Sequence, residues 1–233
     1  MQSSNEAILQ AGNLFVYCVH NPVMFVDPTG LSRERAREYM ERWWNDRNPD
    51  FPYWGSNCAN FVSQVLFAGG VGPVHEQWYV MTNFDRSWWM GRVVGSLGTR
   101  GVRSRYGINV FFNNASENGM TVLLSDTWNA ANAQFNFFSN PDNGFINGRV
   151  LTITNTSILE LIIRYGNIQV GDLVYFSDDG GQSMFHAAIV SSVSATEIYL
   201  AGNTNDWLDE ALSPRIRDRT IYIVRLRDEV FSS

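Results

Sequence analysis

The chain contains no lysine, and all 17 of its basic residues are arginine. Two explanations stay open: a GC-rich genome that favours arginine codons, or protection from lysine-directed marking in a host cell or from the protein's own transfer chemistry. The 23 acidic residues outnumber the basic ones, so the formal net charge is −6. Because a negative surface repels phosphate backbones and anionic lipids, the composition argues against a nucleic-acid or membrane-surface partner.

Cysteine, histidine and long apolar runs are also scarce. The two cysteines, Cys18 and Cys58, lie in segments of different character, so we expect no disulfide framework. The three histidines, His20, His75 and His186, are scattered without ligand spacing, so we expect no metal. No apolar run is long enough to cross a bilayer, and the N-terminus does not read as a signal peptide. We therefore expect no membrane insertion, and a chain cut from a longer one.

Apolar residues are nevertheless sufficient for a core, at 45% of the 233 positions, with 14% aromatic. Periodicity predicts an α+β fold. The predicted helices cover residues 33–45, 58–68, 84–90, 126–138 and 158–165, and the predicted strands cover residues 173–176, 184–193, 197–203 and 220–226. Residues 71–120 are predicted to form an elaborated loop around the short helix, and residues 204–212 a polar loop.

Cys58 begins the predicted helix over residues 58–68, which Gly69 and Gly70 end. Backbone N–H groups and the positive end of the helix dipole favour a thiolate at that position, and the same donors can hold an oxyanion. A helix built only for packing would more often have Ser, Thr or Asp there. Two interpretations stay open, a nucleophile or a small buried hydrophobic residue.

His186 and Asn203 favour the nucleophile. His186 opens one predicted strand and Asn203 ends the next, so we expect adjacent antiparallel strands to bring the two side chains together. A cysteine, a histidine and a polar orienting group, distant in sequence and close in space, make an activated thiolate.

Residues 57–70 resemble the signature D-C-T-N-F-V-S-Q-x-L-x-x-G-G of the putative bacterial amidase domain family, a branch of the papain-like, NlpC-type cysteine hydrolases. The resemblance extends over about residues 32–212. Thr127-Trp128 is similar to the family's S-W pair, and residues 171–190 are similar to its G-D…D-H-V-x-I-V strands. Asn57 and Phe185 stand where the family usually has Asp, and Asn203 takes a place often held by His. The resemblance implies a papain-like fold, with the nucleophile helix packed on a small antiparallel sheet.

Residues 12–31 resemble the end of an Rhs repeat-associated core, G-N-L-Y-x-Y-x-x-N-P-x-x-x-x-D-P-x-G-L. In such proteins the core forms a hollow β-shell, and a variable toxin follows it. This resemblance predicts two parts: residues 1–31, the end of the Rhs core, and residues 32–233, a papain-like cysteine hydrolase toxin domain. It implies two partners, the parent Rhs shell and a cognate immunity protein.

Together the two resemblances imply a secreted toxin that is delivered into a target cell and hydrolyses amide bonds of a protein in its cytosol. Cys58 would attack as a thiolate paired with His186, and Asn203 would fix the imidazole. The N–H of Cys58, with Asn57 or Tyr53, would line the oxyanion hole. Water would resolve the thioester, so no cofactor is required. Other targets stay open: peptidoglycan stem peptides in the periplasm, glutamine deamidation or acyl transfer. A non-enzymatic binding module with a decayed site is the alternative of another class.

Overall fold

The computed structural model describes residues 32–51, 55–72, 88, 90–94, 102–103, 109–110, 120–217 and 219–231 of the chain. The segment that resembles an Rhs core, with Cys18, lies outside the described residues, as does Tyr53. Every element described below belongs to the unit Ser32–Ser233.

A six-stranded antiparallel sheet forms the centre of this unit, with the strand order β5-β10-β6-β7-β8-β9. Its strands are β5 (Leu151–Ile153), β6 (Leu173–Ser177), β7 (His186–Val193), β8 (Ile198–Gly202), β9 (Trp207–Ala211) and β10 (Thr220–Val224). All five residues of β6 are buried, as expected for a central strand covered on both faces. Together with the helices, this sheet confirms the predicted α+β class.

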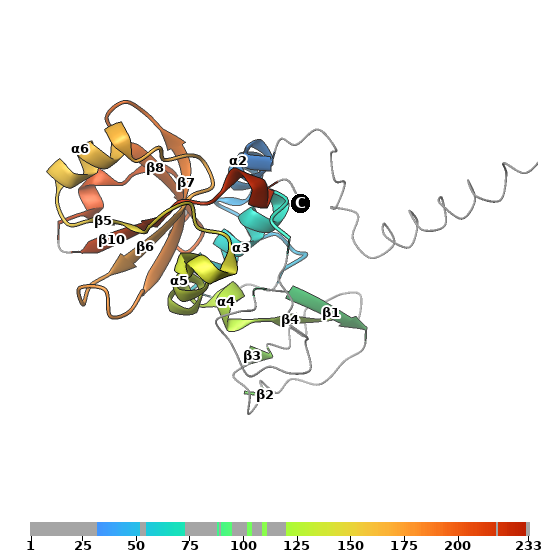
Figure 1. Ribbon diagram of the computed structural model, residues 1–233. Coiled ribbons are helices and arrows are strands. Elements are labelled where there is room, and N and C mark those ends of the chain that lie inside the picture. The colour runs from blue at the N-terminus through green and yellow to red at the C-terminus, as the bar shows by residue number, and fades with distance from the viewer. Residues whose placement is uncertain are drawn as a thin grey trace, which may run out of the picture. The chain divides into compact units, whose positions relative to one another are not determined.

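Helices cover both faces of the sheet (Figure 1). α6 (Thr156–Tyr165) lies on one face, and α2 (Ser32–Trp43), α3 (Cys58–Ala68) and α5 (Ala131–Ser139) lie on the other. Side chains alternate between the faces along a strand. In β7, Ala187 and Ile189 join the core beneath α3, whereas Ala188 and Val190 join the core beneath α6. A residue's position along β7 therefore decides which face it occupies.

α3 is enclosed by the rest of the unit, and its first nine residues are all buried. Its limits are those that the sequence predicted. Gly69 donates its N–H to backbone carbonyls of the last turn, and Gly70 follows with φ 89°, a left-handed conformation that glycine adopts without strain. α2 ends at Trp43, two residues before the predicted limit.

The predicted helix after Ser125 is two helices, α4 (Asp126–Asn129) and α5. Ser125 caps α4, because its hydroxyl accepts from the backbone N–H of Trp128. Ala130 is extended, with φ −116° and ψ 124°, and this single residue separates the two helices. The chain before Ser125 is β4 (Met120–Leu124), which pairs with β1 (Met90–Val94), and β2 (Val102–Arg103) pairs with β3 (Asn109–Val110).

Two sequence-based expectations need correction, and one strand was not predicted. The helix predicted to end at Met90 is wrong at its described residues, because Trp88 forms a β-bridge and Met90 begins β1. The polar loop predicted for residues 204–212 contains β9, an edge strand whose exposed Asp209 and Glu210 hide the alternation of a half-buried strand. β5 was not predicted either, since its three residues at the opposite edge are too few for a periodicity.

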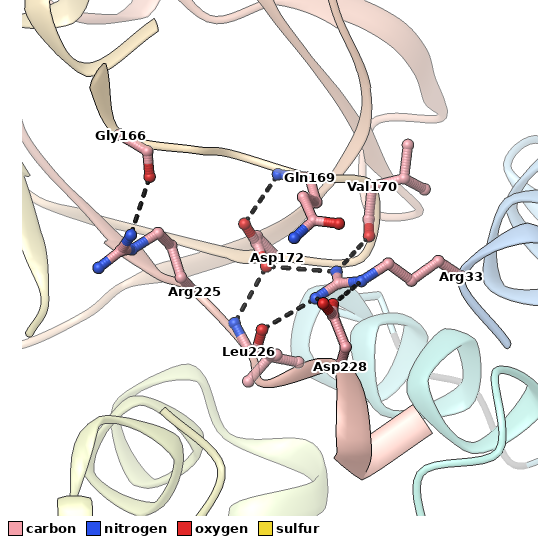
Figure 2. Close-up of polar contacts among 8 residues, drawn as sticks. All are labelled: Arg33, Gly166, Gln169, Val170, Asp172, Arg225, Leu226 and Asp228. Atoms are coloured by element: carbon pink, nitrogen blue, oxygen red, sulfur yellow. Dashed lines mark hydrogen bonds and ion pairs between the residues drawn. The ribbon is translucent and has the colours of Figure 1, made fainter. Parts of the chain in front are cut away.

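A buried carboxylate, Asp172, ties the start of α2 to the sheet (Figure 2). Asp172 is 1% exposed and accepts the backbone N–H groups of Gln169 and Leu226 at 2.9 and 3.0 Å. Arg33 reaches it from α2 at 3.4 Å and also donates to the carbonyls of Val170 and Leu226. Burial raises the pKa of Asp172 to about 6, although these hydrogen bonds and Arg33 act in the opposite direction. α2 is therefore fixed against both the turn before β6 and the chain after β10.

No helix in the described part of the chain is long and apolar enough to cross a bilayer.

Candidate active site

Cys58 is the first residue of α3 and lies on the α3 face of the sheet. It is 5% exposed, is not in a disulfide, and belongs to the core cluster that contains Tyr175 and Ala187. Asn57 is the N-cap residue, but its side chain makes no capping hydrogen bond. The first turn of α3 thus keeps its backbone N–H groups without a side-chain cap, which is the arrangement that an anion at a helix N-terminus requires.

The side chain of Asn57 bonds to two other asparagines instead of capping α3. Its Nδ2 donates to Oδ1 of Asn203 at 2.7 Å, and its Oδ1 accepts from Nδ2 of Asn60 at 2.9 Å. The backbone N–H of Asn57 donates to the hydroxyl of Thr204 at 3.1 Å. Asn57 is 2% exposed, so its amide is part of the buried framework beside Cys58.

Asn203 occupies the turn after β8, on the same face of the sheet as Cys58. Its Nδ2 donates to the carbonyl oxygens of Trp43, Trp44 and Asp46 at 2.7, 3.1 and 2.9 Å. Backbone carbonyls at the end of a helix have no N–H partner within the helix. At the end of α2 the side-chain amide of Asn203 is the donor. The amide thus joins the end of α2 to the residue before α3.

Further buried hydrogen bonds lead from Asn60 to the helices that follow β4. The Trp128 indole donates to Oδ1 of Asn60 at 3.0 Å, and the Ser63 hydroxyl donates to the Trp128 carbonyl at 2.8 Å. Ser63 also accepts from the Trp88 indole and from Nε2 of Gln134. These roles were not predicted from the sequence. A signal was present, because Asn60 and Ser63 are three residues apart and so share one helix face.

Tyr175 of β6 lies under Cys58 and is fully buried. Burial raises the pKa of its phenol well above the ordinary value, and the nearby Cys58 raises it further. Its hydroxyl donates to Oε1 of Gln134 at 3.3 Å. The phenol therefore stays neutral and places no negative charge beside Cys58.

His186 lies on the other face of the sheet, beneath α6. It stands opposite Phe176 in the β6–β7 register, and the two ring centroids are 5.5 Å apart. The Trp207 ring and the His186 imidazole make a T-shaped contact, with 5.0 Å between their centroids. Arg215 stacks on the same Trp207 ring. Phe176 belongs to the core beneath α6, whereas Cys58 belongs to the core beneath α3. The sheet therefore separates the two side chains that we expected to pair.

The environment of His186 favours the neutral imidazole. Burial, together with the positive charges of Arg215 and Arg219, lowers its pKa to about 4. Its Nε2 is buried and has no hydrogen-bond partner among the described residues. A neutral imidazole can act as a base, but the ion pair with Cys58 is absent from this arrangement.

The register explains why His186 and Asn203 do not meet. Ile189 of β7 pairs with Ala201 of β8, so Asn203 falls opposite position 187, one residue beyond His186. Neighbouring residues of a strand point to opposite faces. The expected contact between the two side chains is therefore not made, and the polar atoms of Asn203 bond to α2 and Asn57. The structure brings together Cys58, Asn57 and Asn203, and it places His186 apart.

No group of three or more His, Cys, Asp or Glu side chains that could hold a metal occurs among the described residues.

The comparisons with known proteins agree with part of this picture. The family model described as "Putative amidase domain" matches residues 30–224. The uncharacterized protein YhbB of Bacillus subtilis is 42% identical over 55 residues, which are 24% of this chain and 16% of YhbB. The match thus spans about a sixth of that relative. No solved structure matches the chain.

Proposed function

The chain belongs to the putative amidase domain family, and on that premise we propose that it hydrolyses amide bonds with Cys58 as the nucleophile. The observation that carries the proposal is the position of Cys58, the first residue of a buried helix whose N-terminus lacks a side-chain cap. Helix N–H groups and the dipole stabilise a thiolate there, and afterwards the oxyanion of the tetrahedral intermediate.

In the proposed reaction the sulfur of Cys58 attacks the amide carbonyl and its proton passes to the base. The C–N bond then breaks, the base returns the proton to the leaving amine, and a thioester remains. The backbone N–H of Cys58 donates to the oxyanion. Asn57 is less suited to this task than we expected, because both ends of its amide already bond to neighbouring asparagines. Water then hydrolyses the thioester and restores the thiol, so the cycle consumes only water.

His186 remains our proposed base, and this role requires a movement at the start of β7. A shift of one residue would carry its imidazole to the α3 face, because strand side chains alternate with a period of two. Phe185 is 46% exposed, its ring centroid already lies 6.5 Å from that of Phe176, and the same shift would carry it onto the α6 face. The turn before β7 contains Gly180 and Gly181, both with positive φ, where the chain can absorb such a change. It would also release Nε2 of His186, which has no partner within the described part of the chain, from the apolar core.

For the substrate we propose a protein in the cytosol of a cell into which an Rhs shell delivers this domain, with an immunity protein protecting the producer. Two features of the sequence support this proposal. The net charge of −6 suits an anionic cell-wall polymer poorly. A chain without lysine would also persist in a cytosol that marks proteins on lysine.

The test compares the wild-type protein with Cys58→Ala and, as a matched cysteine control, Cys18→Ser. Each protein is incubated with cell lysate and, separately, with purified sacculi, and released peptides are identified by mass spectrometry. We expect new protein fragments from lysate with the wild type and Cys18→Ser only. Cys58→Ala should remain folded, since removing one sulfur from the core costs about 1 kcal/mol. Cleavage by folded Cys58→Ala would refute the cysteine mechanism, and stem peptides released from sacculi alone would move the substrate to the cell wall.

A further inference from the structure

We propose that Asn203 is a positioning residue for the nucleophile helix, and that it acts on Cys58 through Asn57 and Asn60 rather than through His186. The inference rests on the proposed role of Cys58 as nucleophile. It assigns Asn203 a task different from the one that its place in the sequence suggested, which was to orient the imidazole.

The first argument is the continuity of the hydrogen bonds around the N-terminus of α3. Asn203 accepts from Asn57, Asn57 accepts from Asn60, and Asn60 accepts from the Trp128 indole, at 2.7, 2.9 and 3.0 Å. All four side chains are at most 2% exposed. In such a dry environment each bond is costly to break, because the released partner finds no water. This series of hydrogen bonds therefore fixes Asn57, which precedes Cys58, and Asn60, which lies in the first turn of α3.

The second argument is that Asn203 is an amide and uses both of its functions. Nδ2 donates to three carbonyls at and after the end of α2, while Oδ1 accepts from Asn57. A carboxylate of the same shape could accept from Asn57, but it would lie against three carbonyl oxygens and donate to none. An imidazole can donate from one nitrogen and accept at the other, so it can keep both connections. The geometry therefore predicts that His can replace Asn at this position and that Asp cannot.

The third argument concerns the alternative route, in which Asn203 would act on Cys58 through His186. The His186 side chain lies on the opposite face of the sheet, against Phe176 and Trp207. Asn203 lies on the Cys58 face, and the carbonyls of α2 with Asn57 occupy its amide. In the observed arrangement the hydrogen bonds that lead from Asn203 toward Cys58 therefore run through α3.

A double-mutant cycle tests the proposal, with the rate of Cys58 alkylation by iodoacetamide at fixed pH as the readout. All proteins carry Cys18→Ser, so that Cys58 is the only thiol in the chain. Asn203→Ala should slow alkylation about fivefold, because a displaced first turn no longer holds the thiolate with its N–H groups and dipole. Asn203→Asp should slow it at least as much, and Asn203→His should restore most of the rate.

The same substitution in two mutant backgrounds separates the route through His186 from the route through Asn57. We expect Asn203→Ala to have the same fivefold effect in a His186→Ala protein, and little further effect in an Asn57→Ala protein. An effect that vanishes when His186 is absent would overturn the proposal, as would unchanged alkylation in folded Asn203→Ala. Circular dichroism and thermal unfolding establish folding. If Asn203→Ala does not fold, Asn60→Ala replaces it, because it breaks the same chain one bond further on.

The alkylation readout needs no turnover. A protein that follows the expected cycle but hydrolyses no amide would refute the proposed function and leave this inference standing. A protein that hydrolyses amides through Cys58 but shows coupling between Asn203 and His186 would do the reverse.

Discussion

Protonation of His186 should destabilise the protein, and the sign of this effect tells which face of the sheet the imidazole occupies. Burial and two nearby arginines lower its pKa from 6.5 to about 4. Between these values the unfolded chain binds more protons than the folded one. The contribution to stability is therefore fully present above pH 6.5 and is lost as the pH falls to about 4. An imidazole paired with a Cys58 thiolate would have a raised pKa, and its contribution would be lost as the pH rises.

The size of the effect follows from the two pKa values. At 1.36 kcal/mol for each pH unit, the gap between 6.5 and about 4 corresponds to about 3 kcal/mol of unfolding free energy. His186 keeps some contact with solvent, which screens the arginines, so we expect about 2–3 kcal/mol. Asp172 opposes this trend. Its pKa of about 6 lies above the unfolded value of 3.8, so its contribution is lost as the pH rises between them.

The measurement is the difference in unfolding free energy between the wild type and His186→Gln, from urea titrations between pH 4 and pH 7. The contribution of Asp172 to the unfolding free energy cancels in this difference, because both proteins contain Asp172. We expect the advantage of the wild type to shrink by about 2–3 kcal/mol as the pH falls. An NMR titration of the His186 imidazole should give a midpoint near 4. A midpoint above 6.5, or an advantage that grows on acidification, would refute the placement of His186 beneath α6.

Two further predictions concern the framework that holds the site. Asp172→Ala should lower the free energy of unfolding by about 3–5 kcal/mol, because it leaves Arg33 and two buried N–H groups without their carboxylate. Asp228→Ala, which removes the 71% exposed partner of the same arginine, should cost about 0–1 kcal/mol; equal losses in urea titrations would contradict the assigned roles. Gly181→Ala should lower the melting temperature more than Gly180→Ala, although φ is positive at both, because only the first added methyl group meets the Tyr222 hydroxyl. Similar melting temperatures for the two glycine variants would show that this contact relaxes.

Helix and strand periodicity predicted most of the fold, because the main elements have strong patterns. α3 carries apolar residues at helical spacing and a Gly-Gly stop, and both of its limits were predicted correctly. β6, β7, β8 and β10 are central strands with apolar runs, and they were predicted with small errors at their ends. The edge strands β5 and β9 were missed, since one face of an edge strand meets solvent and tertiary pairing, rather than local pattern, decides its conformation.

The arrangement of the site was harder to predict, because successive side chains of a strand point to opposite faces of the sheet. The sequence predicted that His186 opens a strand and that Asn203 ends the next one. In the structure His186 does begin β7, but β8 ends at Gly202, one residue before Asn203. It could not predict the register between the two strands, because a slip of one residue exchanges the faces of every side chain. Ala187 and Ala188 are both small and buried, so the hydrophobic pattern at this end of β7 fits either face. The pairing of Ile189 with Ala201 is what places His186 away from Asn203.

The burial of α3 explains why the motif that begins at Cys58 contains several polar residues. A helix buried on all sides can hold polar residues only where each has a partner. Asn60 bonds to Asn57 and Trp128, Ser63 bonds to the Trp128 carbonyl, and Gln64 accepts from the Tyr39 hydroxyl at 2.7 Å. These three polar positions are therefore explained by the packing of α3 against its neighbours, without any part in the chemistry. Cys58 is buried in the same core, and under the proposed function it is the residue of the motif that takes part in the reaction.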